Sequence, residues 1–386
     1  MNLGPIENAA PHSILFAVAG MLIIVGILWE AFESVILPRR VARRFRFTVL
    51  VYRSLWHPWR FAARQLKGTK ARETFLSFFG PLSVLILFAV WAAAIIVGFG
   101  LLFYSRTTID STHPTFETCL YLSGTTMFTL GIGDVLPHTW SERFMVVVES
   151  GIGFGFLALI LSYLPVIYQA FSRREVNIVL LDARAGSPPT AAEMLRRHAG
   201  SSAGPEVERI LRDWERASAD ILESHVSYPA ACYFRSQHTN ESWLAALTAI
   251  LDTCSLLMAC IDHCASRQAK LTFAMCRHTV VDLSQLFGER PIQDAADRLP
   301  SAEYRRLYKV LTDAGFQVRD EYESCSKLTK LRSMYEPFVQ ALARYLYMEV
   351  PPWILAKEIT DNWRTSAWGR ISGLTPDSQI ADDHND

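Results

Sequence analysis

The sequence Thr129-Leu130-Gly131-Ile132-Gly133-Asp134 lies between two apolar segments, residues 81–104 and 144–171, that are each long enough to cross a bilayer. A dehydrated cation needs a stack of oxygen ligands in place of its water, and a Thr-x-Gly-x-Gly loop supplies them from main-chain carbonyls. Successive carbonyls point along one axis only where every second residue leaves the usual φ/ψ regions, which glycine does at little cost. The stretch therefore predicts a cation-binding loop within a membrane.

Three segments qualify as membrane spans: residues 13–37, 81–104 and 144–171. At about 1.5 Å per residue, each is long enough as a helix to cross a hydrocarbon core of about 30 Å. Residues 1–12 contain no Lys or Arg, and the apolar run after them is too long for a cleaved signal peptide. We therefore expect the first segment to remain as a transmembrane helix.

The composition of the 386 residues divides the chain into two parts. Half of the residues are hydrophobic and mean hydropathy is +0.15, but the long apolar runs are confined to residues 1–171. Residues 172–386 have the pattern of a soluble helical domain. The net charge is zero, so it gives no indication of a nucleic-acid partner. Six of the seven cysteines lie in the soluble part without a disulfide spacing, which favours free thiols in a reducing cytosol.

The distribution of basic residues predicts the orientation. Residues 38–73 hold eleven Lys and Arg and one acid, which indicates a cytoplasmic loop. The short loop at 105–113 carries only Arg106 and is expected outside, whereas Arg173 and Arg174 return the chain to the cytoplasm. We expect a multi-pass protein of the plasma membrane, or of the inner membrane if the source is bacterial, with its N-terminus outside and its C-terminus in the cytoplasm.

The basic segment allows two interpretations. Arginine recurs at every third position from Arg40 to Arg46, as in voltage-sensing helices, but a sensor needs a four-helix bundle and only one span precedes this segment. The favoured interpretation is an interfacial helix. Arginine also recurs every seven residues on one helical face, and Trp56 and Trp59 suit the headgroup level.

Residues 114–137 are expected to enter the membrane and return. Pro114 is a good first residue for a short helix that ends near Phe128, and the glycine loop and a turn at Pro137 follow it. A helix of about fourteen residues spans only about 20 Å, which is too short to cross. The negative end of its dipole would face the ion cavity, which favours a cation.

The block from Tyr121 to Val135, YLSGTTMFTLGIGDV, resembles the pore loop of the two-transmembrane-type potassium channel pore family. The resemblance covers about residues 78–171, and Glu149 stands where similar channels often carry an acid in the inner helix. It implies ion sites at the main-chain carbonyls of Thr129, Leu130, Gly131 and Ile132, followed by the second filter glycine, Gly133, with the Thr129 hydroxyl at the inner site. It further implies that Asp134 is held by a donor on the pore helix, and Tyr121 stands where similar channels often have Trp.

The resemblance implies a potassium-selective channel that conducts K⁺ passively. One loop cannot surround an ion and the sequence contains no second such loop, so we expect a homotetramer. The expected partners are K⁺ and membrane lipids, with no nucleic acid, no cofactor and no metal other than the permeant ion. We see no convergent nucleophile–base set or metal motif and expect no enzymatic activity; His225 and His238 are interpreted as surface or packing residues.

Two alternatives remain open. Ile132 replaces the usual aromatic residue of the filter, and Phe128 replaces the usual Thr before it. These two departures motivate a weakly selective Na⁺/K⁺ channel as the first alternative, while potassium selectivity remains the favoured interpretation. The second alternative is a membrane-anchored sensor whose pore-like module does not conduct.

The third span, as the inner helix, contains candidate gating residues. Glycines at alternate positions thin the helix, a proline removes one intrahelical hydrogen bond, and apolar side chains around it can close a pore by dewetting. The candidates are Gly151, Gly153, Leu161, Leu164, Pro165 and Tyr168. The alternative is that these residues face lipid or neighbouring helices.

We predict an all-α protein with four parts: an N-terminal transmembrane helix at 1–37, a basic interfacial segment at 38–77, an ion-channel pore domain at 78–171, and a helical regulatory or assembly domain at 172–386. Helical patterns cover 205–226, 240–287 (as one or two helices), 304–316 and 328–348, and residues 175–186 fit either a strand or an extension of the third span. Thr190 is a candidate cap of a short helix.

A cluster of cysteines and histidines between residues 254 and 278 suggests metal binding or redox sensing. Cys260 and Cys264 are four apart and would share a face of one helix. The spacing is not that of a zinc module, however, and buried helical cysteines usually act as small hydrophobic residues. The favoured interpretation is therefore structural.

Overall fold

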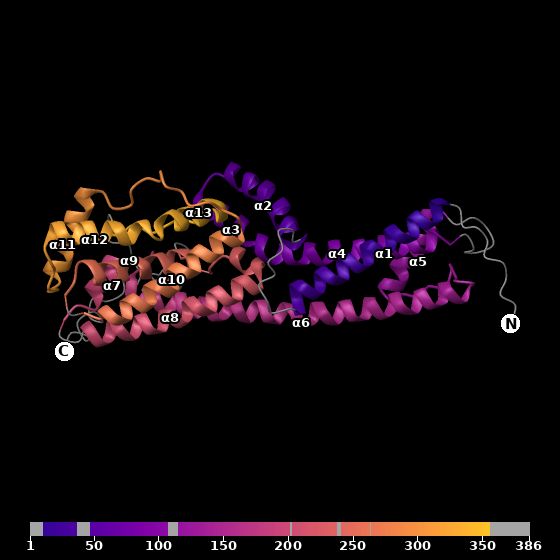
Figure 1. Ribbon diagram of the computed structural model, residues 1–386, viewed down its shortest axis with the longest axis horizontal. Helices are drawn as coiled ribbons and strands as arrows, with labels where there is room; N and C mark the ends of the chain where they lie inside the picture. The colour runs from indigo at the N-terminus through magenta and orange to yellow at the C-terminus, as the bar shows by residue number, and fades with distance from the viewer. Residues whose placement is uncertain are drawn as a thin grey trace, which may run out of the picture. The chain divides into compact units, whose positions relative to one another are not determined.

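The computed structural model describes residues 11–36, 47–106, 115–200, 203–237, 241–262 and 264–355 (Figure 1). These residues form helices and no β-strand, apart from one isolated antiparallel bridge between Ile261 and Val318, which confirms the all-α prediction. The chain divides into two compact units. Unit 1 comprises Met1–Gln169 with Ser227–Ala230, and unit 2 comprises Ala170–Val226 with Ala231–Asp386.

Unit 1 contains the helices that are candidates for crossing a membrane. In chain order they are α1 (Pro11–Ala31), the π-helical turn η1 (Phe32–Ile36), α2 (Phe47–Gln65), α3 (Thr69–Ser77), α4 (Phe79–Tyr104), α5 (Phe116–Met127) and the first part of α6 (Trp140–Ala185). Three stretches are long and apolar enough for a span: Ser13–Val35, Thr69–Tyr104 and Trp140–Ala185. Each of the three spans expected from the sequence therefore coincides with a helix that is long and apolar enough to cross a membrane.

Helices α1 and α4 approach each other closely through two glycines. A Cβ at Gly20 would lie 2.5 Å from the Gly98 carbonyl oxygen, and one at Gly98 would lie 2.6 Å from Cγ1 of Ile24. Small residues at a helix crossing let the two backbones come near enough for extensive van der Waals contact. The glycines therefore place α1 along α4.

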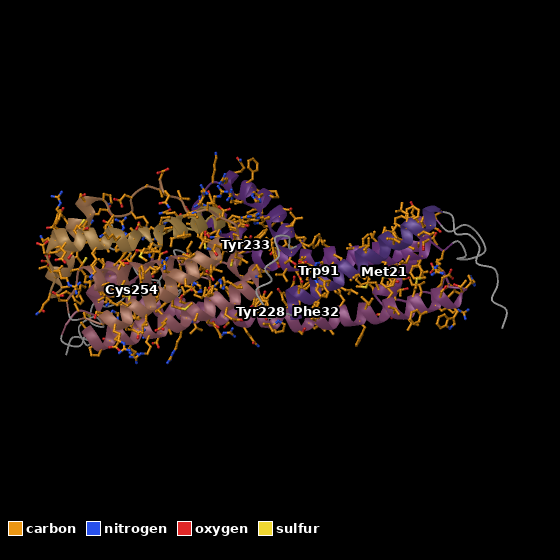
Figure 2. The ribbon with its side chains drawn as sticks, in the orientation of Figure 1. Met21, Phe32, Trp91, Tyr228, Tyr233 and Cys254 are labelled. Atoms are coloured by element: carbon orange, nitrogen blue, oxygen red, sulfur yellow. The ribbon has the colours of Figure 1, made fainter. Side chains whose placement is uncertain are left out.

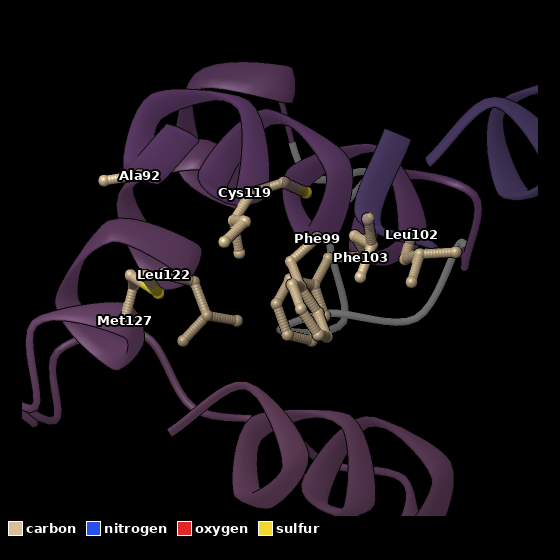
Figure 3. Packing of buried hydrophobic residues seen from close by; sticks show 9 residues of the cluster. Ala92, Phe99, Leu102, Phe103, Cys119, Leu122 and Met127 are labelled. Atoms are coloured by element: carbon tan, nitrogen blue, oxygen red, sulfur yellow. The ribbon is translucent and has the colours of Figure 1, made fainter. Parts of the chain in front are cut away.

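The core of unit 1 joins α4 to the short helix α5. Cys119, Leu122 and Met127 of α5 lie in one cluster with Phe99 and Phe103 of α4 (Figure 3). Partly buried side chains of α6, among them Ile152 and Phe156, pack against this cluster. The short helix is thus held between the second and third spans, where the sequence predicts a pore helix.

The two tryptophans of the basic segment lie on α2. The arginines from Arg39 to Arg46 lie outside the described residues, but α2 is described and packs against α3 and α4. Trp56 is buried, with its ring centroid 4.7 Å from that of Phe79, and Trp59 stacks on Phe75 at 4.5 Å. Trp56 therefore contacts this chain's own helices, and the headgroup level of the two tryptophans stays a prediction.

Unit 2 is built around α9 (Trp243–Ala259), whose residues are all buried and which contains Cys254 (Figure 2). Helices α7 (Ala191–Arg197), α10 (Ser266–Leu286), α12 (Glu321–Ser333) and α13 (Glu336–Leu346) pack against it. The remaining elements are the last part of α6, α8 (Ala203–Ser227), the 3₁₀ turn η3 (Pro229–Tyr233) and α11 (Ser301–Asp313). An almost wholly apolar helix forms the centre because it has no polar face to present to water.

Several boundaries differ from the sequence prediction. Residues 175–185 extend α6, which resolves the choice between strand and helix. The pattern at 240–287 is two helices, and the single helix expected at 328–348 is two, because the chain breaks before Glu336 and restarts with Pro337 in the first turn of α13. Thr190 caps α7 by accepting a hydrogen bond from Glu193 N at 3.2 Å.

One buried carboxylate ties the helices of unit 2 together. Arg298 donates to Asp252 Oδ2 at 2.7 Å and to Glu336 Oε1 at 2.9 Å, and the Tyr335 hydroxyl donates to Asp252 Oδ1 at 2.5 Å. The Arg298 guanidinium also lies over the ring of Trp353, 5.7 Å from its centroid. The network joins α9, α13 and residues near Trp353 without leaving the Asp252 charge uncompensated.

We predict that Asp252→Ala destabilises unit 2 by about 3 kcal/mol, because it leaves the buried Arg298 charge without its main partner. Thermal unfolding of the purified protein, followed by circular dichroism, measures the change. The control is Asp313→Ala, at an exposed carboxylate near the end of α11. Equal unfolding temperatures for the two variants would contradict a stabilising role for the network.

Candidate functional site

Helix α5 has the length and the caps of a re-entrant helix. It runs from Phe116 to Met127, and the Thr115 hydroxyl caps it by accepting from Thr118 N at 3.3 Å. It begins two residues later than expected, and Pro114 lies outside the described residues. Twelve residues span about 18 Å, so α5 cannot cross a bilayer.

The C-terminus of α5 turns sharply into the glycine loop. Leu130 N donates to the Thr125 carbonyl at 2.8 Å, and Thr129 N donates to the Thr126 carbonyl at 3.0 Å. This pair of bonds is the Schellman motif, in which the residue after the helix cap adopts the left-handed conformation. That residue is usually glycine, but here it is Thr129, with φ +55°.

Three alternate residues of the loop have positive φ: Thr129 (+55°), Gly131 (+56°) and Gly133 (+84°). The alternation is the backbone pattern that the sequence predicts for carbonyls directed along one axis. Glycine adopts it at little cost, whereas a β-branched residue in this region is strained by about 1–2 kcal/mol. Threonine at this position therefore retains a side-chain hydroxyl at the expense of local backbone strain.

A hydrogen bond attaches the loop to α5. The Tyr121 hydroxyl donates to Asp134 Oδ2 at 2.9 Å, and Val135 N donates to Asp134 Oδ1 at 3.1 Å. The resemblance implied a donor on the pore helix for Asp134, and the structure places Tyr121 in that position. Both ends of the loop are thus attached to α5, one through the helix cap and the other through this side-chain pair.

The start of α6 is fixed by a capping box. Glu142 Oε2 accepts from His138 N at 3.0 Å and Thr139 N at 3.1 Å, and the Thr139 hydroxyl accepts from Glu142 N at 3.3 Å. This reciprocal arrangement satisfies main-chain donors at the helix start. It begins α6 at Trp140, four residues before the predicted span, and sets where the chain turns after the loop.

Of the inner-helix glycines, Gly153 makes the close contact with α5. A Cβ at Gly153 would lie 2.0 Å from the Met127 carbonyl oxygen, whereas one at Gly151 or Gly155 would meet nothing within 4 Å of the described atoms. Gly153 thus lets α6 pack against the residue that precedes the loop. From the sequence, Gly151 and Gly153 were predicted together as gating candidates, with no difference between their environments.

A buried acid faces α5 from α6. Glu149 Oε1 is in hydrogen-bonding contact with Ser123 Oγ, which also lies 2.9 Å from the Ile96 carbonyl oxygen. Glu149 Oε2 is buried and has no hydrogen-bond partner among the described residues. The contact links α4, α5 and α6 behind the loop. The sequence analysis identified Glu149 but missed Ser123. A hydroxyl residue on a short helix that packs beside a span carrying an acid could have indicated this contact.

The gating candidates that follow Gly153 along α6 differ in how exposed their side chains are. Leu161, Pro165 and Tyr168 are exposed in the single chain, whereas Leu164 is partly buried. Helix α6 continues through Pro165. The exposed residues are three or four apart and share a face. Leu164 lies three residues after Leu161 and four before Tyr168, so it borders the same face and differs from the other three in being partly buried.

The cysteines of unit 2 do not assemble a metal site in the described part of the chain, where no group of three or more His, Cys, Asp or Glu side chains converges. Cys260 follows the last residue of α9 and Cys264 precedes α10, so they do not share one helix. Burial raises the pKa of Cys260 to about 11 and that of Cys276 to about 12, which disfavours reactive thiolates. His263 and His238 lie outside the described residues.

Comparison with known proteins agrees with this geometry. Residues 75–169 match the family model described as "Ion channel". Neither the curated proteins nor the solved structures include a match.

The matched residues include α4, α5, the glycine loop and most of the apolar part of α6. This segment is an ion channel domain of that family, and the chain is a multi-pass membrane protein with ion channel activity.

We predict that Gly153→Ala disrupts the packing of α6 on α5, because the added methyl group would overlap the Met127 carbonyl. Gly155→Ala is the matched control on the same helix, where alanine meets no described atom and has the higher helix propensity. Thermal unfolding of the full chain in detergent should show a loss of several degrees for the first variant and little change for the second. Equal losses would contradict the contact.

We predict that Tyr121→Phe loosens the glycine loop by removing the hydrogen bond that the Tyr121 hydroxyl donates to the Asp134 carboxyl group. The expected result is ion flux that declines with time while the protein remains folded. Tyr104→Phe is the control, because the Tyr104 ring packs against Phe116 and no hydrogen bond of its hydroxyl is part of the loop. Sustained flux in Tyr121→Phe would show that the bond is dispensable.

Proposed function

We propose that the protein is a potassium-selective channel in which four copies surround one conduction path. The ion sites are the carbonyls of Thr129, Leu130, Gly131 and Ile132, together with the Thr129 hydroxyl. The observation that carries the proposal is the alternation of positive φ along this loop, within a segment that matches an ion channel family. Several sites in series let ions enter readily and leave by mutual repulsion.

Exposure of the loop supports the tetramer. Residues 128–134 are all exposed in the single chain, including Leu130 (64%) and Ile132 (61%). Exposed apolar side chains that lie together mark a surface that another molecule covers. Three neighbouring copies would bury them and would complete the ring of oxygens that one loop cannot form.

The charge distribution around the loop supports a cation as the permeant ion. The C-terminal end of α5, with the negative end of its dipole, precedes the loop directly. Asp134 follows the loop and Glu149 lies behind it, and no Lys or Arg occurs between Glu117 and Glu142. We propose that the path needs no cofactor and that the chain has no enzymatic activity.

The proposal includes selectivity for potassium over sodium. Ile132 and Phe128 motivate the alternative of a weakly selective channel. Both side chains are exposed in the single chain, and Ile132 cannot donate the hydrogen bond that an aromatic hydroxyl provides. The hydrogen bond between Tyr121 and Asp134 supplies a different restraint on the loop, which supports retention of potassium selectivity. A weakly selective Na⁺/K⁺ channel remains the second candidate.

We propose the orientation that the basic residues predict, with the N-terminus outside, unit 2 in the cytoplasm, and the chain in the plasma membrane or the bacterial inner membrane. Eleven Lys and Arg in residues 38–73 support it. We also propose that Leu161 and Tyr168, which share an exposed face of α6, narrow the path below the loop when the channel is closed.

We predict that purified full-length protein in liposomes conducts potassium and that barium blocks it. Gly131→Ala should abolish the flux, because alanine does not readily hold φ +56°. Gly315→Ala is the matched control: it also substitutes a positive-φ glycine (+86°) in open space, but in unit 2, and should conduct. Reversal potentials in mixed potassium and sodium then measure selectivity.

The outcomes separate the candidate functions. A reversal potential that follows the potassium gradient supports the proposal, whereas one near zero in opposed potassium and sodium indicates the weakly selective channel. Absence of flux from wild-type protein that is folded and tetrameric would favour the membrane-anchored sensor.

A further inference from the structure

The part of α6 that belongs to unit 2 has an exposed apolar face. Val176 (56%), Val179 (49%) and Leu180 (51%) are each about half exposed, and Val179 and Leu180 lie three and four residues after Val176, on one side of the helix. Arg174 and Glu175 are buried on a different side, where Arg174 donates to the carbonyls of Ala231 and Phe234 at 2.9 Å. The helix is thus firmly held on one side and uncovered on the other.

A groove runs beside this face, between α6 and α8. It has a volume of about 460 Å³, and its apolar lining includes Val176, Leu180 and Trp214. Its charged lining carries both signs: Arg173, Arg184 and Arg216 on one hand, and Asp213 and Asp220 on the other. Arg173 is bonded to Asp220 at 3.4 Å within the groove. A mixed-sign rim around an apolar floor suits a protein surface better than a purely anionic headgroup.

The exposed face belongs to an uncharged row of residues on α6. From Leu161 the row continues through Pro165, Tyr168, Ser172, Val176, Val179 and Ala183, at intervals of three or four residues, and every member is exposed in the single chain. Its first members are the residues proposed to line the path below the loop. A helix that lines a path shared by four copies brings three equivalent helices to the same axis.

We infer that a second copy of this chain covers the Val176–Val179–Leu180 face, with the neighbouring copy's α6 seated along the groove between α6 and α8. The inference rests on the proposed tetramer and extends it: four copies meet through the extended α6 helices of unit 2 as well as around the loop. The charges that line the groove then meet the same charges of the neighbour, and the two signs allow complementary pairing.

Cross-linking of the full chain tests the inference. Cys325, which is the exposed cysteine among the described residues, is first replaced by serine, and one new cysteine is introduced per variant. Val179→Cys and Ala183→Cys lie on the uncharged row of α6. Leu271→Cys is the matched control, because Leu271 is an exposed apolar residue of α10 with the same exposed fraction, 49%.

Each variant is purified in detergent, treated with a short bifunctional maleimide and analysed on a denaturing gel. Val179→Cys and Ala183→Cys should shift mostly to the dimer band, and Leu271→Cys should remain largely monomeric at the same protein concentration. Light scattering and potassium flux are measured on the same preparations.

Monomeric Val179→Cys and Ala183→Cys in a conducting tetramer would overturn the inference and leave the proposed channel intact. Protein that is monomeric by light scattering and carries no flux would overturn both. Equal cross-linking at Leu271→Cys would also overturn the inference, since the contact would then not be specific to α6.

Discussion

The hydrogen bond from Leu130 N to the Thr125 carbonyl is the interaction on which the pore segment depends. It ends α5 and forces Thr129 to a positive φ, and from there Gly131 and Gly133 continue the alternation. Thr129 is strained in this conformation, and strain of this kind persists only where the surroundings determine the backbone. Here they do so from both ends, through the helix cap and through the bond between Tyr121 and Asp134.

Close packing keeps α5 in place. Its apolar side meets Phe99 and Phe103 of α4, and its last carbonyl meets α6 at Gly153, where no side chain intervenes. Glu149 and Ser123 add a polar contact between α6 and α5. In hydrocarbon, where water supplies no partners and little hydrophobic force draws helices together, such close approaches and hydrogen bonds are what fix helix positions. The helices that support the loop are therefore packed too closely to accept larger side chains at these contacts.

The sequence predicted much of this arrangement because its strongest features are local. Long apolar runs gave the three spans, and the spacing of Gly131 and Gly133 gave the loop. Features that depend on tertiary contact were not available from the sequence. Nothing local distinguishes Gly153 from Gly151, since only the Met127 carbonyl makes one of them indispensable for packing. A sequence pattern also cannot show that Thr129, a residue type that avoids positive φ, is held there by a helix cap.

Tertiary contacts also surround Trp56 and the break before Glu336. Trp56 has the amphipathic character of a headgroup residue, and Phe79 of the same chain packs against it. At the break between Ser333 and Glu336, Glu336 pairs with Arg298, a residue distant in sequence that a periodicity argument does not include. In both units, contacts between residues distant in sequence account for features that the sequence pattern did not predict.

The most direct measurement is a density map of the full-length protein in potassium, determined without imposed symmetry. We expect four chains whose Thr129–Ile132 carbonyls surround a common axis, with ion density between successive rings that changes when potassium is replaced by sodium. A map in which Gly131 and Gly133 lie against lipid or against unit 2, away from any axis that relates the copies, would contradict it.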